Sequence, residues 1–357
     1  MRVRYRNEIS PGEIRKILVR ATNWVGDAVL ITPSLVALRK TFPHAQITVL
    51  ANPWVLPLLE NHPAADRMMV MDKGTGLLRS MGTVKRIISH VRNEAFDLAV
   101  LFQNAFEAAL LAYMGGVRYR IGYNTDGRGF LLTHKVIRDE RILGVHQVDY
   151  YLGLIEAMGW QVAEREPSIY LCDSDIASTS RMLSSRGIED HHVIVGLNPG
   201  ATYGSAKRWP EERFAAIGDW AVERWTATVI LFGSSSERDI GLRVSQRMQH
   251  APVNLCGLTT LGEVMALIKR CNFFVTNDSG LMHIAAAFNV PLVALFGPTN
   301  HITTGPVSGN ARIVRHAFDC SPCLKETCPL DHRCMLSIEP GEAWDAMESL
   351  KRELKIS

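Results

Sequence analysis

The chain has 357 residues, of which 47% are hydrophobic, and its formal net charge is +3. This length and apolar content are enough for two sizeable cores, which excludes a disordered or fibrous protein. The first 14 residues are polar and contain Arg, unlike a secretory signal, and no apolar run approaches the 18 residues of a membrane span. We therefore expect a cytoplasmic protein without a transmembrane segment.

The basic residues are concentrated in the first half of the chain. Residues 1–163 contain 20 Lys and Arg against 14 Asp and Glu, whereas residues 164–357 contain 19 against 22. The basic half, which includes Arg118, Arg120 and Arg128, would attract an anionic partner such as a phosphorylated lipid surface. An ordinary solvated basic face explains the pattern equally well. No nucleic-acid partner is expected, because no recognition motif or aromatic platform accompanies the charge.

The first half reads as alternating strands and helices. A buried-type strand at 16–20 is followed by a turn at 21–27, a helix over 28–40 and a second strand at 45–51. A further strand is predicted at 97–102 and a helix at 150–158. The pattern lapses after this helix, so we place the domain boundary between residues 170 and 171.

The second half repeats the same order of elements. A strand at 193–197 is followed by a loop at 198–209, a helix starting near Pro210 and a strand at 228–232. Further strands are predicted at 273–276 and 291–296, and a last helix at 340–355 could pack back on the N-terminal half. Strands that are apolar on both faces and joined by helices indicate parallel sheets. The predicted fold class is α/β, with two doubly wound Rossmann-like domains, 1–170 and 171–357, that face a cleft.

Ligands of such sheets bind beyond the carboxyl ends of the strands. At one of these ends, the strand at 273–276 leads through Asp278, Ser279 and Gly280 directly into a helix. The N-terminus of a helix presents unpaired backbone N–H groups and a partial positive charge, which suits phosphate. His283, on the first turn, could donate to that phosphate or be structural.

Lys207 lies in a loop rich in Gly and hydroxyl side chains, at 200–210. Small residues let the backbone approach phosphate oxygens, and Lys adds a compact charge. The loop is not a P-loop, and no Gly-x-Gly-x-x-Gly follows a strand, so a nicotinamide dehydrogenase is disfavoured. A surface Lys in an ordinary loop is the competing interpretation.

Two acidic residues follow other strands. Asp27 could cap a helix or, at a strand end, act as a general base. Glu237, within 232–239, could bind a ribose hydroxyl pair or belong to a capping box, and the two interpretations are equally good. No Asp-x-Asp follows a strand, so a diphosphate would have to be neutralised by the Lys and the helix N-terminus rather than by a bridging metal ion.

The cysteines fall into two groups. Cys172, Cys256 and Cys271 lie in apolar contexts and are expected to be small core residues. The other four are spaced C-x2-C-x4-C-x5-C within the segment 316–335, at Cys320, Cys323, Cys328 and Cys334. Such crowding suggests a structural zinc or other metal, although the spacing is not a standard zinc pattern. Two labile disulfides or a thiol-rich loop without a ligand are the alternatives.

Several short motifs are informative when they are taken together, and they lie at 23–27, 198–202, 206–210, 231–234, 276–283 and 295–298. As a set they resemble the motifs of the ADP-heptose:lipopolysaccharide heptosyltransferases, glycosyltransferase family 9. Within that family, the type II enzymes are the most similar. The resemblance covers residues 15 to 300, and its motifs occur in order. It implies a GT-B fold with ADP-heptose in the C-terminal half and the acceptor in the N-terminal half. The implied reaction is an inverting, metal-independent transfer of L-glycero-D-manno-heptose onto the heptosyl-Kdo inner core of lipid A, in lipopolysaccharide core biosynthesis at the cytoplasmic face of the inner membrane.

The resemblance also implies roles for individual residues. Asp27 matches the catalytic base, and Lys207 the diphosphate-binding Lys. Further donor-site residues are implied to be Thr202, Glu237, Asp278, Ser279, Gly280, Leu281, Met282 and His283. The acceptor-binding candidates are Asn23, Trp24, Asn104 and Arg120. A family 9 enzyme of type I or III, one using another nucleotide sugar, or a non-catalytic nucleotide- or glycan-binding protein would share the fold. The presence of both Asp27 and Lys207 argues against the last.

Overall fold

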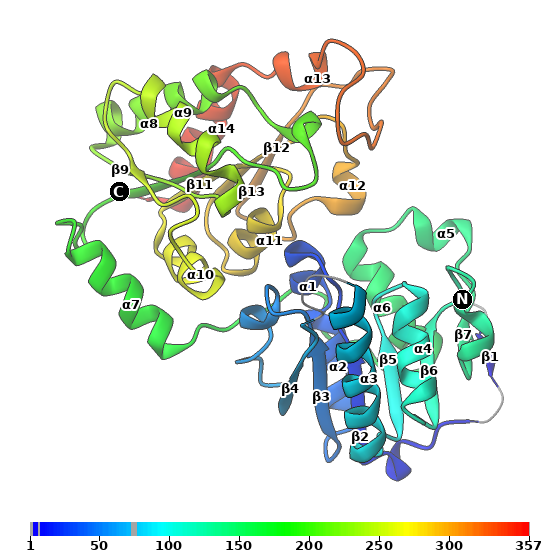
Figure 1. The fold of residues 1–357 in the computed structure, drawn as a ribbon. Coiled ribbons are helices and arrows are strands. Elements are labelled where there is room, and N and C mark those ends of the chain that lie inside the picture. The colour runs from blue at the N-terminus through cyan, green and yellow to red at the C-terminus, as the bar shows by residue number, and fades with distance from the viewer. Residues whose placement is uncertain (1–2, 6–7, 73–76, 357) are drawn as a thin grey trace. The chain divides into compact units, whose positions relative to one another are not determined.

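The computed structural model describes residues 3–5, 8–72 and 77–356, with the backbone alone for residues 77–81. It contains two compact units, Met1–Tyr170 and Leu171–Ser357. Each unit has one sheet, largely parallel in the first and wholly parallel in the second, with helices between its strands (Figure 1). The predicted α/β class with two doubly wound domains is therefore confirmed.

The sheet of the first unit has seven strands among the described residues, in the order β1-β7-β6-β5-β2-β3-β4. They are β1 (Val3–Tyr5), β2 (Lys16–Arg20), β3 (Gln46–Ala51), β4 (Arg67–Val70), β5 (Leu98–Leu101), β6 (Tyr119–Tyr123) and β7 (His134–Val136). Only β1 is antiparallel to its neighbour. β2 pairs with β3 and β5, and every β2 residue except Lys16 is buried, as its apolar sequence predicts.

The helices of the first unit are α1 (Val25–Leu30), α2 (Thr32–Thr41), α3 (Leu77–Glu94), α4 (Phe106–Met114), α5 (Glu140–Leu143) and α6 (Gln147–Ala157), with 3₁₀ turns η1 (Pro11–Glu13), η2 (Leu56–Leu58) and η3 (Arg128–Leu131). The single helix predicted at 28–40 is in fact two helices. Pro33 occupies the first turn of α2, where its missing N–H costs nothing, but it could not continue α1.

The sheet of the second unit has six described strands, all parallel, in the order β10-β9-β8-β11-β12-β13. They are β8 (Ile194–Asn198), β9 (Thr228–Leu231), β10 (Val253–Asn254), β11 (Phe273–Asn277), β12 (Leu292–Leu295) and β13 (Ala311–Val314). The helices are α7 (Asp173–Ser184), α8 (Glu211–Trp225), α9 (Arg238–Arg247), α10 (Leu261–Arg270), α11 (Gly280–Ala287), α12 (His301–Thr304), α13 (Arg333–Leu336) and α14 (Pro340–Leu354), with 3₁₀ turns η4 (Ser205–Lys207) and η5 (Ser235–Glu237).

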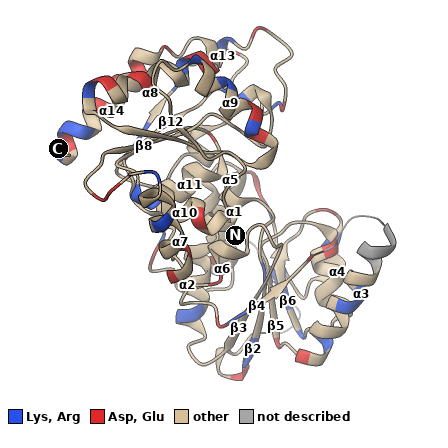
Figure 2. Cartoon of the chain, turned by 60° about the vertical axis from the view of Figure 1, so that its left-hand side comes forward, with Lys and Arg blue, Asp and Glu red and all other residues tan. Residues whose placement is uncertain are grey.

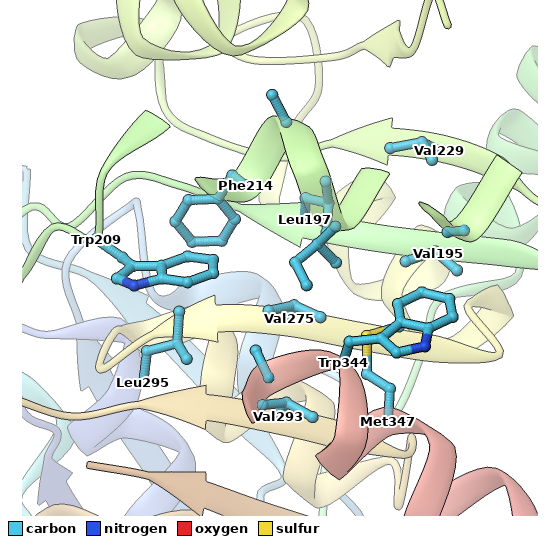
Figure 3. Packing of buried hydrophobic residues seen from close by; sticks show 14 of the residues in the cluster. Val195, Leu197, Trp209, Phe214, Val229, Val275, Val293, Leu295, Trp344 and Met347 are labelled. Carbon is cyan, nitrogen blue, oxygen red and sulfur yellow. The ribbon is translucent and has the colours of Figure 1, made fainter. Parts of the chain in front are cut away.

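One face of the second sheet packs on α8 and α14. Trp344 and Met347 of α14 are buried against Val275 and Val293 of the central strands (Figure 3). The predicted return of this last helix to the N-terminal half stays a prediction; its apolar side is buried in the second unit's own core.

Trp209 lies at the end of the core that is nearest to the carboxyl ends of the strands (Figure 3). It is 1% exposed, and its indole Nε1 donates a hydrogen bond to the carbonyl of Ile338 at 2.9 Å. The loop that carries Lys207 therefore ends in one of the largest buried side chains of the unit, which fixes where the loop enters α8.

Charged residues lie mainly on helices and loops, and in the second sheet the described strands other than β13 carry none (Figure 2). Positive and negative residues are interspersed along α8, α9 and α14, as expected of solvated helix faces. Among the described helices, none combines the length and apolar composition that a membrane span requires.

Candidate active site

In each sheet, the chain adds parallel strands in one direction and then reverses, crossing back to add the rest on the other side of the first of them. In the second unit the chain runs outward from β8 through β9 to β10, then crosses to β11 on the other side of β8. In the first unit the same reversal separates β2 from β5. The helices that follow two such strands lie on opposite faces of the sheet and leave a crevice at the strand ends, where ligands bind. The candidate residues are therefore those that follow β8 and β11, or β2 and β5.

Asn198, the last residue of β8, connects the two strand ends of the second unit. Its Nδ2 donates to Thr276 Oγ1 at 2.9 Å and to Ser279 Oγ at 2.8 Å. Ser279 is the N-cap residue of α11, but its side chain does not cap the first turn of that helix. The hydroxyl is held at the strand ends instead, which leaves the first-turn N–H groups from Gly280 onward to face an anion.

Asn277, the last residue of β11, holds both ends of the Lys207 loop, residues 199–209. Its Nδ2 donates to the carbonyls of Pro199 at 2.9 Å and Gly200 at 3.3 Å, at the start of the loop. Its Oδ1 accepts from the backbone N–H of Trp209 at 3.0 Å, at the end of the loop. The Asn277 side chain is fully buried, where such hydrogen bonds are costly to break. We did not predict this role, although a polar residue at the end of an apolar strand could have indicated it.

Lys207 and Asp278 form an ion pair beside the N-terminus of α11. The Lys207 Nζ lies 2.7 Å from Asp278 Oδ2, and the two side chains are only 14% and 6% exposed. Lys207 also lies over the ring of Tyr203, 4.9 Å from its centroid. An unpaired charge would be unfavourable at this depth, so Asp278 balances the ammonium while no other anion is bound. A phosphate arriving here would compete with Asp278 for Lys207.

The other predicted donor-site residues of the Lys207 loop and α11 differ in burial. Thr202 is exposed in the Lys207 loop, and Leu281 is half-buried on α11. Met282 and His283 are buried, so the side chain of Met282 belongs to the core. If Met282 contributes to ligand binding, it does so through its backbone N–H.

Glu237 is part of a capping box. Its Oε2 accepts hydrogen bonds from the backbone N–H of Ser234 at 2.8 Å and from the Ser234 hydroxyl at 2.7 Å. The side chain is buried, and a Cβ added to Gly200 would lie 2.3 Å from its Oε1. The structural interpretation of Glu237 is therefore correct, and a side chain at position 200 would require the Glu237 carboxylate to move. A ribose contact stays a prediction.

Asp27 lies half-buried in the first turn of α1, directly after β2. It is a hydrogen-bond partner of Tyr151 on α6. Burial, followed by the charge and hydrogen bond of Asp27, raises the pKa of Tyr151 well above its ordinary value. The phenol therefore stays protonated and keeps donating to the carboxylate, which orients Asp27 at the strand end. The sequence contained no signal for this partner, because it lies 124 positions further on.

Asn23 organises the turn before α1. Its Oδ1 accepts from Arg20 Nη2 at 3.0 Å and from Asn52 Nδ2 at 2.8 Å, and its carbonyl accepts from Trp54 Nε1 at 2.7 Å. Trp24 and Trp54 are 57% and 59% exposed. Trp24, in this turn after β2, and Trp54, after β3, are thus exposed indoles next to a fixed polar network.

Asn104 follows β5 and is held by Arg128, a residue that we placed on a basic surface. Arg128 is instead fully buried, and burial lowers its pKa to about 10. It donates to the carbonyls of Gln103 and Tyr123 and to Asn104 Oδ1 at 3.0 Å. The surface assignment of Arg128 is therefore wrong, because a sequence does not show which Arg will be enclosed by main-chain carbonyls.

Arg120 is the one acceptor candidate that the structure does not bring to these strand ends. It is the second residue of β6, and its guanidinium donates to the carbonyls of Val117 and Leu131. Its charge also lies over Tyr113, 5.3 Å from the ring centroid.

The four clustered cysteines gather around one pocket of the second unit, and none of the described cysteines forms a disulfide. Burial, followed by the neighbouring thiols, raises the pKa of Cys334. Yet among the residues that the structure describes, no three His, Cys, Asp or Glu side chains are arranged to hold a metal ion. The nearby His316 and His332 bind Glu342 and the Ala206 carbonyl. The predicted zinc is therefore not supported.

Comparisons with known proteins agree with this arrangement. The model of glycosyltransferase family 9 (heptosyltransferase) matches residues 84–333. Lipopolysaccharide heptosyltransferase 2 of Salmonella typhimurium is 30% identical over 95% of this chain and 99% of its own. The Escherichia coli K12 protein of that name is 31% identical over 94% and 98%. The solved structure of E. coli ADP-heptose lps heptosyltransferase II is 28% identical, with a TM-score of 0.82 over 95% of this chain and 99% of that one.

These comparisons, together with the two Rossmann-like units, identify the chain as a glycosyltransferase of the GT-B type. More narrowly, the chain belongs to glycosyltransferase family 9, the heptosyltransferases. The resemblance noted in the motifs is thereby confirmed.

Replacing Asn277 tests how the Lys207 loop is held. Asn277→Ala removes the partner of the Trp209 N–H and of two carbonyls. Each buried group left unpaired costs about 1–3 kcal/mol, so the free energy of unfolding should fall by at least that amount. Urea titration followed by circular dichroism measures the change. Asn310→Ala, which loses a bond to the Asn289 carbonyl near the surface, is the control. Equal stability of the two variants would contradict the assigned role of Asn277.

Proposed function

We propose that this chain transfers L-glycero-D-manno-heptose from ADP-heptose to the heptosyl-Kdo inner core of lipid A, with inversion and without a catalytic metal. The observation that carries the proposal is the Lys207–Asp278 pair at the N-terminus of α11 and at the strand reversal of the second unit. Relatives named lipopolysaccharide heptosyltransferase 2 match nearly the whole chain, which supports the substrate.

The second unit is the donor half of the proposed enzyme. Its strand reversal offers two independent sources of positive charge, the ammonium of Lys207 and the N-terminus of α11. Both are aimed at the same edge of the sheet, and a diphosphate carries enough negative charge to use both. As the sugar is transferred, the charge on the departing ADP increases, and it is stabilised by the α11 N-terminus and by Lys207, for which the phosphate competes with Asp278. Because Lys207 and the N-terminus of α11 neutralise the diphosphate, no bridging metal ion is required.

The first unit is the acceptor half. Asp27, oriented by Tyr151, takes the proton from an acceptor hydroxyl as its oxygen attacks the anomeric carbon of the donor. One bond forms to the acceptor oxygen while the bond to the ADP oxygen breaks, so a single displacement inverts the configuration. Exposed aromatic rings follow the strands of this unit, and such rings suit sugar and lipid surfaces. They are Trp24, Trp54, Phe106 and Phe130.

Because the proposed acceptor is attached to lipid A, we propose that the reaction takes place at the cytoplasmic face of the inner membrane. The chain would work there peripherally, drawn by the phosphates of its acceptor and by the excess of basic residues in 1–163. A family 9 enzyme with another acceptor or nucleotide sugar remains the alternative, because the residues that select the acceptor are not defined by the donor-site geometry.

Product analysis tests the substrate assignment. The purified protein is incubated with ADP-heptose and either Kdo2-lipid A or its monoheptosylated form, and products are identified by mass. We expect one heptose to be added to the monoheptosylated form and none to the unmodified one. Transfer to unmodified Kdo2-lipid A would indicate a type I enzyme. Transfer to neither acceptor, or transfer from other nucleotide sugars, would overturn the proposal.

Asp27→Asn tests the base. The amide keeps the size of the side chain but cannot accept the proton, so turnover should fall by about 10²- to 10⁴-fold. ADP-heptose affinity, measured by calorimetry, should stay near normal because the donor binds in the other unit. Asp345→Asn, an exposed substitution on α14, is the matched control. Turnover that survives in Asp27→Asn would remove Asp27 from this role.

Lys207→Ala tests the diphosphate site. Loss of a charge-assisted hydrogen bond of about 1.5–3 kcal/mol should weaken ADP binding by about 10- to 100-fold and lower turnover as well. Calorimetric titration with ADP measures the affinity. Lys269→Ala, on the exposed side of α10, removes the same charge elsewhere in the unit. Unchanged ADP affinity in Lys207→Ala would contradict the assignment.

A further inference from the structure

The segment 316–335, which contains the four clustered cysteines, is not explained by the proposed reaction. It packs directly on the Lys207 loop. The backbone N–H of Ala206 donates to the Glu326 carbonyl at 2.9 Å, and the Tyr203 hydroxyl donates to the Leu324 carbonyl at 3.1 Å. On its other side the segment is tied to the turn after β12, where the Leu324 N–H donates to the Pro298 carbonyl at 2.9 Å. The segment thus bridges the loop and the sheet.

His332 contacts the residue before Lys207 with its side chain. Its Nε2 lies 2.7 Å from the carbonyl of Ala206, the residue before Lys207. A carbonyl can only accept, so Nε2 carries the proton and donates. The thiols of Cys320, Cys323, Cys328 and Cys334 line a pocket together with His332 and Ala206, so the loop forms part of the wall of that pocket.

Two backbone features indicate that this contact is specific. Leu324 and His332 both have left-handed backbone angles, with φ of 55° and 57°, which are uncommon for residues other than glycine. Both residues bind the Lys207 loop, Leu324 through its carbonyl and His332 through its side chain. In addition, a Cβ added to Gly204 would lie 2.1 Å from the Glu326 carbonyl oxygen, so loop and segment are in contact without spare room. Unfavourable backbone angles that coincide with a contact point to function.

We propose that the segment 316–335 is a clamp that positions the Lys207 loop for the donor diphosphate, with His332 as its positioning residue. The inference rests on the proposed function, because it takes this loop to be the diphosphate site. His332 does not reach the substrate in this role. It holds the Ala206 carbonyl, and through the adjoining peptide it sets where the Lys207 side chain leaves the backbone.

Three substitutions at His332 separate positioning from general stability. His332→Ala removes the donor. His332→Asn tolerates the left-handed backbone, but its amide reaches only to the position of Nδ1. His332→Gln places an amide N–H near the position of Nε2. Loss of one hydrogen bond should raise the ADP dissociation constant about three- to tenfold in the Ala and Asn variants, and Gln should restore it to within about twofold.

His316→Ala is the matched control, because His316 lies in the same segment but binds Glu342 rather than the loop. Gly204→Ala approaches the contact from the loop side and should raise the dissociation constant in the same direction as His332→Ala. Circular dichroism confirms that each variant is folded before calorimetric titration with ADP. A folded His332→Ala variant with unchanged ADP affinity overturns the clamp, as does failure of Gln to restore a weakened affinity.

Lys207→Ala, titrated alongside, keeps the two proposals distinguishable. If Lys207→Ala weakens ADP binding and His332→Ala does not, the clamp is wrong and the diphosphate site stands. If neither variant changes the affinity, the diphosphate assignment itself is wrong.

Discussion

The buried amide of Asn277 is the contact on which the rest of the proposed donor site depends. One side chain accepts from the end of the Lys207 loop and donates to its beginning, so the loop cannot shift without breaking buried hydrogen bonds. The first unit uses the same device. Arg128 there donates to the carbonyls at the end of β5, and to Asn104 beside them. In both units a buried polar group fixes the backbone that follows a central strand, and the candidate residues extend from that backbone.

The sequence predicted the central strands well and the edges of the sheets poorly. β2, β8 and β11 are apolar on both faces, so their runs stand out from any surrounding pattern. Several unpredicted strands are short or partly exposed, as β4 and β10 illustrate. Such strands form because a neighbour offers hydrogen bonds, and that neighbour is distant in sequence. The sequence also missed β6, which has five residues and lies inside the first sheet.

The site was predictable where residues follow a strand directly, because parallel strands bring their ends to one edge. Asp27, Lys207 and Asp278 lie at those ends for this reason. Their partners were not predictable. Tyr151 meets Asp27, and His332 meets the Lys207 loop, through tertiary packing across more than a hundred residues. Likewise, only the folded structure distinguishes Arg128, which is enclosed by carbonyls, from an Arg on the surface.

The restraint at both ends of the Lys207 loop also determines when its conformational entropy is lost. Ordering the backbone of one residue costs roughly 1–2 kcal/mol of free energy. If a loop is mobile before binding, this cost lowers its affinity for the ligand. Here the loop ends in the buried Trp209 and begins at carbonyls bound by Asn277, so folding has already ordered it. A nucleotide would then encounter a rigid template, and its affinity would depend chiefly on charge, and hence on the ionic strength of the surroundings.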